Sequence, residues 1–138
     1  MGLAYANIDI FNARNLSLGP VSVRALADAG ALHLCIPESV ASGLQLETLY
    51  ELAVTLADGS TFNCPYVGPI QLRFSERRQG FVGALVMGNQ VLLGAVPMED
   101  LDLIVDPARQ RVIANPSNPD TPGSFATGVT LGAIRRTA

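Results

Sequence analysis

The sequence contains no lysine and no tryptophan, and it has few of the residues from which metal sites and disulfide frameworks are built. Its 138 residues include two cysteines, Cys35 and Cys64, and one histidine, His33. Two cysteines form neither a disulfide scaffold nor a zinc-ligand set, and a single histidine gives no sign of a histidine-based metal site. We therefore expect no metal and no cofactor.

Charge is also scarce, at 15% of residues, and all nine basic residues are arginines in a chain of net charge −3. The sequence shows no basic stripe and no series of stacking aromatics, so we expect no nucleic-acid partner. With 49% hydrophobic residues, the chain has the composition of a folded domain and leaves apolar surface for a subunit interface.

Long apolar runs are absent as well. The longest, FVGALVM and VLLGAVPM, are too short to span a bilayer, and residues 1–7 lack the pattern of a signal peptide. By default we expect a cytoplasmic protein with no membrane partner. The length fits one domain, which we place at residues 1–116. The Pro/Ser/Gly-containing residues 117–138 are expected to form a linker and a mobile tail.

Short runs of β-branched and apolar residues, separated by turn residues, fill most of the chain and predict strands. The predicted strands are residues 6–11, 21–27, 32–36, 50–56, 61–63, 67–74, 81–87, 91–93, 102–106 and 110–114. Short helical segments are predicted at residues 37–44 and 98–101, and Asp58-Gly59 is a strong hairpin signal. Arg77-Arg78 falls in a predicted turn, where it serves only solubility. This pattern predicts an all-β, barrel-like domain with one or two short helices.

The stretch LADAGALHLCIPE (residues 26–38) contains a lone carboxylate, Asp28, at the end of a predicted strand. Gly30 follows, and glycine can adopt backbone conformations that bring N–H groups close to a carboxylate. Asp28 either caps a turn through an Asx-type hydrogen bond or is a strongly acidic functional group. This segment alone leaves both interpretations open.

Three elements along the chain resemble those of a known enzyme family. Asp28-Ala29-Gly30-Ala31 resembles the Asp-Thr/Ser-Gly-Ala/Ser signature of aspartic peptidases, and Leu92-Leu93-Gly94 resembles the apolar-apolar-Gly element that follows the flap in retropepsins. The Asp58-Gly59 hairpin lies between them, where these enzymes carry the flap. With the segments HLCIPE, PYVGPIQLRF and GALVMGNQVLLGAVPMEDLDLIVDP, the resemblance to small bacterial clan AA aspartic peptidases of retropepsin type extends over roughly residues 8–116.

The resemblance implies a closed retropepsin-like barrel with one lobe per chain, acting as a homodimeric aspartic endopeptidase on a peptide or protein substrate. Such enzymes use two carboxylates that share one proton. This chain holds a single signature, so the second carboxylate is expected to be Asp28 of a symmetry mate. The expected supporting residues are Ala29, Gly30 and Ala31 in the catalytic loop, Ala57, Asp58, Gly59 and Ser60 in the flap, and Leu92, Leu93 and Gly94 beneath the loop.

The sequence departs from the family pattern at Ala29, where active members carry Thr or Ser. That hydroxyl hydrogen-bonds across the dimer axis in the family, and alanine can neither donate nor accept. Leu32 is a milder departure, because related sequences tend to be polar there. Three alternatives stay open: a peptidase impaired by Ala29, an inactive peptide-binding or assembly module with the retropepsin fold, and an Ala29 that was introduced or selected to suppress self-cleavage.

Other candidate residues have simpler interpretations. His33 is expected to be a surface or core histidine rather than a catalytic one. Cys35 and Cys64 are expected to act as small buried hydrophobes and not as nucleophiles. Glu99, Asp100 and Asp102 are expected to form a solvated face rather than a cation site.

Overall fold

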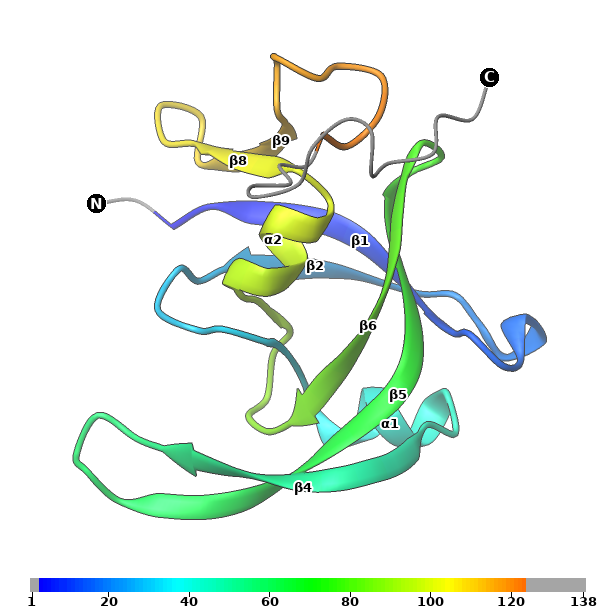
Figure 1. Cartoon of the computed structure of the whole chain (residues 1–138), viewed down its shortest axis with the longest axis vertical. Coiled ribbons are helices and arrows are strands. Elements are labelled where there is room, and N and C mark those ends of the chain that lie inside the picture. Colours follow the sequence, from blue (N-terminus) through cyan, green and yellow to red (C-terminus); the bar gives the residue numbers. More distant parts are fainter. Residues whose placement is uncertain (1–2, 124–138) are drawn as a thin grey trace, which may run out of the picture.

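The computed structural model describes residues 3–123, and strands dominate this part of the chain (Figure 1). The strands are β1 (Tyr5–Asn12), β2 (Val21–Ala27), β3 (Leu34–Ile36), β4 (Glu47–Thr55), β5 (Thr61–Ser75), β6 (Arg78–Val86), β7 (Leu92–Leu93), β8 (Leu103–Asp106) and β9 (Arg111–Ala114). The helices are α1 (Glu38–Gly43) and α2 (Ala95–Asp100), with a 3-10 turn η1 (Leu16–Leu18). Residues 124–138 of the expected tail lie outside the described residues.

Six of these strands close into a barrel. The sheet runs in the order β5-β6-β3-β7-β2-β1, and β1 pairs with β5 as well as with β2, which joins the two ends. Strand β4 lies outside the ring beside β5, and β9 and β8 lie outside it beside β1. The prediction of an all-β closed barrel with one or two short helices is therefore confirmed.

The barrel interior follows from the period-two alternation of the strands. In β1 the side chains of Ala6, Ile8 and Ile10 are buried, whereas the intervening Asn7 is exposed. Fully buried aliphatic side chains from five other strands meet them, among them Ile36, Ile70, Leu72, Ala84 and Leu93, with Ala25 alongside. Each such leucine or isoleucine contributes about 1.5–3 kcal/mol through its removal from water.

Strand β5 differs from the prediction. Two separate strands were expected on either side of Pro65, yet one strand of 15 residues runs through it. A proline cannot donate to a β-ladder, and it is tolerated where a strand has only one neighbour. Pairing with β6 begins only at Tyr66, so Pro65 lies in the part of β5 that pairs with β4 alone.

The helix expected at residues 98–101 begins earlier, at Ala95, directly after Gly94. Pro97 then falls in the first turn, where a missing N–H breaks no intrahelical bond. No helix within residues 3–123 is long and apolar enough to cross a membrane.

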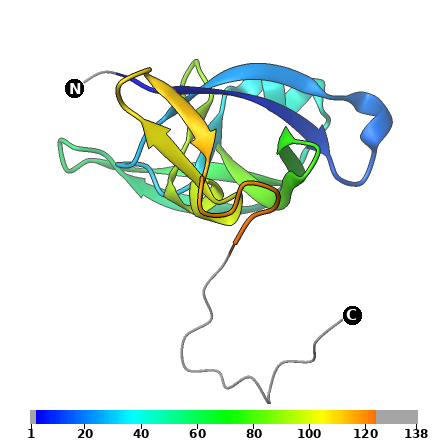
Figure 2. The same ribbon diagram turned by 90° about the horizontal axis from the view of Figure 1, so that it is seen from above.

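The β4–β5 hairpin extends beyond the barrel as an arm. Both ribbon views show its tip projecting away from the other strands (Figures 1 and 2). The loop that joins β2 to β3 faces the same side of the molecule as the arm (Figure 1). The segment with the candidate catalytic residue and the candidate flap therefore border the same space.

Candidate functional site

Asp28 follows the last residue of β2 and begins a tight turn. Its backbone N–H donates to the carbonyl of Leu93 at 3.0 Å, and the N–H of Ala31 donates back to the Asp28 carbonyl at 3.1 Å. The N–H of Gly30 donates to Oδ1 of Asp28 at 3.0 Å, which is the Asx-type bond expected of a turn. No described residue hydrogen-bonds to Oδ2, so the half-buried carboxylate caps the turn and keeps its second oxygen for another partner.

The loop after Asp28 packs against the start of α2 so closely that no side chain fits between them. A Cβ at Gly94 would lie 2.3 Å from the carbonyl oxygen of His33 and 2.8 Å from that of Ala31. The first two amides of α2 use this contact: Ala95 donates to the Ala31 carbonyl and Val96 to the Leu32 carbonyl, both at 2.9 Å. The backbone of the loop is therefore anchored to the β7–α2 junction.

Strand β7 connects this junction to the barrel. It pairs in parallel with the end of β2, Ala27 opposite Leu93, and antiparallel with β3, Cys35 opposite Leu92. Leu93 is fully buried in the core, while Leu92 is half-buried. The apolar-apolar-Gly element thus lies directly beneath the loop that carries Asp28.

The predicted flap residues Ala57, Asp58, Gly59 and Ser60 lie at the exposed tip of the β4–β5 hairpin. Gly59 has a φ of +86°, a conformation that favours glycine. The carboxylate of Asp58 accepts from the hydroxyl of Ser60 at 2.6 Å and from its N–H at 2.9 Å. These bonds, the hydroxyl first, lower the pKa of Asp58, so the turn is held by an ionised carboxylate.

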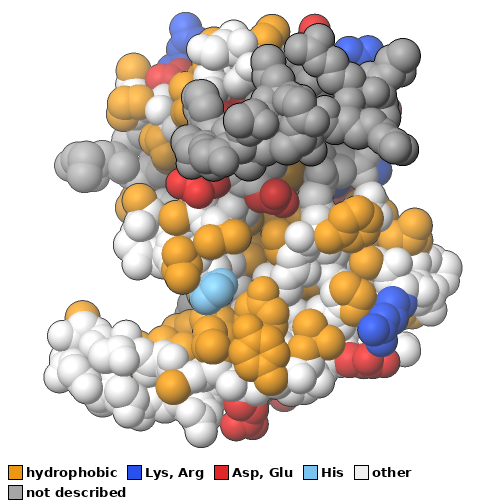
Figure 3. All heavy atoms as spheres, in the orientation of Figure 1, with side chains coloured by type: hydrophobic (Ala, Val, Ile, Leu, Met, Phe, Trp, Pro, Cys, Tyr) orange, Lys and Arg blue, Asp and Glu red, His pale blue; other side chains and the backbone are white. Residues whose placement is uncertain are grey.

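A groove of about 570 Å³ separates the Asp28 loop from the hairpin arm. Its lining residues are Asp28, Gly30, Ala31, Leu32, His33, Cys35, Leu52, Ala53, Val54, Thr55, Leu56, Ala57, Leu85, Met87 and Leu92. The space-filling view shows the molecule hollowed at this place, above the arm (Figure 3). Of the predicted site residues, the groove brings together Asp28, Gly30, Ala31, Ala57 and Leu92. Ala29, Asp58, Gly59, Ser60, Leu93 and Gly94 are not part of its lining.

The sequence interpretation missed the apolar part of the groove lining that comes from β4 and β6. Leu52 and Val54 come from β4, and Leu85 and Met87 from β6 and the residues after it. Alternation of apolar residues along the predicted strand 50–56 was a signal that one face of this segment is covered. That this face lines a groove depends on the pairing of both β4 and β6 with β5, which the local sequence pattern does not specify.

The two cysteines are buried and unpaired, as expected. Burial raises the pKa of the Cys35 thiol, and the nearby Cys64 and the Asp28 carboxylate raise it further. Burial also raises the pKa of Cys64, with a smaller effect of Glu51. Both thiols are therefore held in the neutral form, which is a poor nucleophile.

Arg78 overturns the expectation that the arginine pair lies in a turn and serves solubility. Only 1% of its surface is exposed, and it is the first residue of β6. Its guanidinium donates to the carbonyls of Leu101 and Asp102, both at 3.0 Å, and also to that of Asn118. Arg77 does follow the prediction, because its side chain is 72% exposed.

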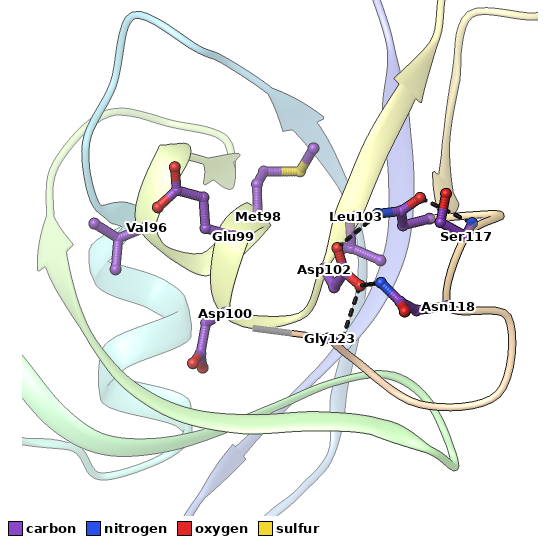
Figure 4. A pocket seen from close by; sticks show the side chains of 10 residues that line it. Val96, Met98, Glu99, Asp100, Asp102, Leu103, Ser117, Asn118 and Gly123 are labelled. Carbon is purple, nitrogen blue, oxygen red and sulfur yellow. Dashed lines mark hydrogen bonds between the residues drawn. The ribbon is translucent and has the colours of Figure 1, made fainter. Parts of the chain in front are cut away.

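Asp102 also departs from the expected solvated face (Figure 4). Its carboxylate accepts from the side-chain amides of Asn115 and Asn118 and from the N–H of Gly123, and it lies 3.8 Å from the guanidinium of Arg78. These contacts, the Gly123 N–H first and the Asn115 amide next, lower its pKa.

The acidic residues of this region do not converge on a cation. Figure 4 shows the side chains of Glu99 and Asp100 pointing away from Asp102. Within residues 3–123, no group of three or more His, Cys, Asp or Glu side chains could hold a metal ion. Asp102 instead fixes the segment from Asn115 to Gly123 against the body of the fold.

Comparison with known proteins gives structural likeness only. No protein-family model matches the sequence, and no curated protein matches it. The solution structure of the simian foamy virus (mac) protease aligns with a TM-score of 0.45 and 14% identity over 68% of this chain and 90% of that one. The EIAV protease in complex with the inhibitor HBY-793 aligns with a TM-score of 0.50 and 16% identity over 72% of this chain and 88% of that one.

At these identities the likeness concerns the fold. The EIAV protease, with the higher TM-score, carries the comparison. The alignment covers 72% of this chain, whose described residues form a closed six-stranded barrel with two short helices. The chain therefore has the retropepsin-like aspartic protease fold.

Proposed function

We propose that the protein is an aspartic endopeptidase that acts as a homodimer, with Asp28 of each protomer forming the catalytic pair. The observation that carries this proposal is the position of Asp28. Its carboxylate lies on the wall of an open groove, with one oxygen bound to the Gly30 N–H and the other without a described partner. The anchored loop behind it supplies the rigidity that a catalytic group needs.

The chemistry requires a second carboxylate. One carboxylate takes a proton from a water molecule, whose oxygen attacks the carbonyl carbon of the scissile peptide bond. The other carboxyl group gives its proton to the carbonyl oxygen. The first carboxyl group then gives its proton to the leaving amine as the C–N bond breaks, and the second takes a proton back from a hydroxyl group of the tetrahedral intermediate, which restores the pair. The two carboxyl groups titrate as one unit. Among the described residues that line the groove of one chain, Asp28 is the one acidic residue, so the proposed partner is Asp28 of a second chain.

The surface beside the Asp28 loop suits a second copy of the chain. Leu32 is 59% exposed and Val96 is 44% exposed. Their backbones are joined by the hydrogen bond from Val96 to Leu32, so these apolar side chains belong to one patch next to Asp28. Association through this patch would remove it from water and bring two Asp28 loops together.

The hairpin arm would hold the substrate. Its tip at residues 57–60 borders the groove, and a peptide in extended conformation can pair with strand backbone while its alternate side chains enter the groove. The largely apolar lining between Leu52 and Ala57 would take up those side chains.

A catalytically inactive peptide-binding or assembly module is the second candidate function. It is favoured by Ala29, which is exposed beside Asp28 and has no hydroxyl to join two catalytic loops. Each hydrogen bond that is lost between the two catalytic loops would weaken the dimer by about 0.5–1.5 kcal/mol. The fold and the groove would be unchanged in such a module.

A peptide-cleavage assay separates these candidates. A mixed peptide library is incubated at pH 4–7 with the natural protein, with Asp28→Asn and with Ala29→Thr, and the products are read by mass spectrometry. The peptidase proposal predicts cleavage that Asp28→Asn abolishes and Ala29→Thr increases. Equal cleavage by the natural protein and Asp28→Asn would reject the catalytic pair, and inertness of all three proteins would favour the binding module.

A further inference from the structure

The groove is lined mainly by apolar side chains, with one carboxylate and one imidazole among them. Its described lining consists of aliphatic side chains, Gly30, the thiol of Cys35, Thr55, the carboxylate of Asp28 and the imidazole of His33. It includes no arginine and no acidic residue other than Asp28. His33 is therefore the one side chain of this lining that can carry a positive charge.

The imidazole of His33 packs against one of a pair of tyrosine rings. Its ring meets the ring of Tyr66 edge-on, with centroids 5.7 Å apart and planes at 72°. Tyr66 is itself packed against Tyr50, at 5.0 Å between centroids. The Tyr66 ring also lies close to Gly83, because a Cβ added at Gly83 would come within 2.3 Å of this ring. Edge-to-face packing of this kind restricts the orientation of the imidazole ring.

The nitrogen atoms of His33 remain available for a ligand. The described hydrogen bond of this residue uses its backbone carbonyl, which accepts from the Cys35 thiol. The ring is only half-buried, and Figure 3 shows the imidazole at the surface of the hollow above the arm. A histidine ring offers at least one N–H donor in its neutral form and two in its protonated form.

The position of His33 places it beside a bound peptide. Asp28 and His33 lie at the two ends of the loop between β2 and β3, on one wall of the groove. An extended peptide exposes a side chain to the same wall about every 7 Å. A peptide bound with its scissile carbonyl at Asp28 would therefore present alternate side chains to the wall that includes His33.

We propose that His33 determines specificity by selecting a substrate with an acidic side chain, Asp or Glu, at the position that faces it. This inference rests on the proposed function of the groove. A carboxylate receives a charge-assisted hydrogen bond from the imidazole, whereas elsewhere on the apolar wall it would lose water without compensation. An uncharged amide of the same size gains less.

Kinetics with matched peptides test the selection. Peptides that the protein or its Ala29→Thr form cleaves are resynthesised with Glu or Gln at each position around the scissile bond. We expect kcat/KM to favour Glu over Gln by about tenfold at one position. His33→Phe keeps a ring against Tyr66 but has no N–H donor, and it should remove this preference. The control Phe81→Ala removes an exposed ring that lies outside the groove lining and should retain it.

Two results would overturn the inference. One is an equal kcat/KM for Glu and Gln peptides at every position tested. The other is a Glu preference that persists in His33→Phe, because the selecting group would then lie elsewhere.

A binding experiment separates failure of this inference from failure of the proposed function. His33 is the only histidine of the 138 residues, so its ring protons give a single set of NMR signals. Asp28→Asn protein is titrated with the Glu and Gln peptides, or with library peptides where none is cleaved. We expect the Glu peptide to shift the His33 signals and to bind about tenfold more tightly.

The combination of outcomes is decisive. If the Glu peptide shifts the His33 signals but no form of the protein cleaves any peptide, the subsite stands and the peptidase proposal fails. If peptides are cleaved but the His33 signals respond equally to Glu and Gln, the peptidase proposal stands and the subsite fails.

Discussion

Neighbouring residues of the same type can have opposite roles, as Arg77 and Arg78 show. The side chain of Arg77 is 72% exposed, whereas that of Arg78 is 1% exposed and tied to backbone carbonyls 23 to 43 residues further along the chain. A buried guanidinium is tolerated only when its donors are satisfied, and here carbonyl oxygens and the nearby Asp102 carboxylate satisfy them. The side chain therefore fastens the end of α2 and the following segment to β6.

Replacing Arg78 tests this role at the residue scale. Arg78→Ala removes the donors for several carbonyls and leaves Asp102 without its buried counter-charge. We expect the free energy of unfolding to fall by about 3–5 kcal/mol, measured by urea denaturation. Arg77→Ala is the matched control and should change it by less than about 0.5 kcal/mol. Similar losses in the two variants would contradict the role assigned to Arg78.

At the scale of elements, the segment after β9 is held by side chains rather than by a ladder. Asn115 and Asn118 donate their amides to the Asp102 carboxylate, and the Gly123 N–H donates to the same group. Asp102 stands between α2 and β8 with a φ of +52°. One carboxylate therefore connects the helix, the terminal hairpin and the residues beyond it.

This arrangement predicts a pH dependence. The pKa of Asp102 is lowered in the folded protein, first by the Gly123 N–H and then by the Asn115 amide. A group with a lowered pKa stabilises the fold above its unfolded pKa, and this stability is lost as the pH falls through the lower folded value. We expect Asp102→Asn to melt below the natural protein at pH 7, and the difference to shrink as the pH falls below about 4.

The control for this experiment is Asp120→Asn. Asp120 is 82% exposed, with a single ion pair to Arg77 at 3.9 Å. Its replacement should leave the melting temperature unchanged at both neutral and acidic pH. A difference between Asp102→Asn and the natural protein that stays constant down to about pH 2.5–3 would refute the ionised role of Asp102, because the Asp102 carboxyl of the unfolded chain is mostly protonated about one unit below its usual pKa.

The accuracy of the sequence-based predictions differs between local and long-range features. The bounds of β2 and the Asp58-Gly59 turn were predicted correctly, since alternation and turn residues are properties of a few neighbouring positions. The burial of Arg78 was not predictable, because its partners are distant in sequence. The motif order predicted a site at Asp28, which does line the groove, but the lining by Leu85 and Met87 depends on the pairing of distant strands.

At the scale of the whole molecule, the proposed activity belongs to two chains. The described lining of each groove includes one acidic residue, and the proposed mechanism uses two carboxylates. If the site forms between protomers, an inactive chain will inactivate each partner that it binds. If each chain acted alone, an inactive chain would only dilute the active one.

Mixing experiments distinguish these cases. The natural protein, or its Ala29→Thr form, is mixed with an equal amount of the same chain carrying Asp28→Asn and allowed to exchange subunits. Activities are compared at the same total protein concentration. With random pairing, a shared site leaves about a quarter of the activity of the unmixed active protein, since only dimers with two Asp28 residues work. Half of the activity, measured with the same peptide, would contradict a shared site. Dimer exchange is checked by mass spectrometry of the intact complex.

The continuous strand β5 has a mechanical consequence. From Tyr66 onward it is clamped between neighbours in the barrel wall, whereas from Thr61 to Pro65 it has only β4 beside it. The arm is thus fixed to the barrel at Tyr66 and free at its tip. An arm that is fixed at one end moves most at the other, so we expect the largest displacements of the arm at Gly59. Tyr66 also packs against the ring of His33. The residue at which the arm joins the barrel therefore contacts the residue that is proposed to select the substrate.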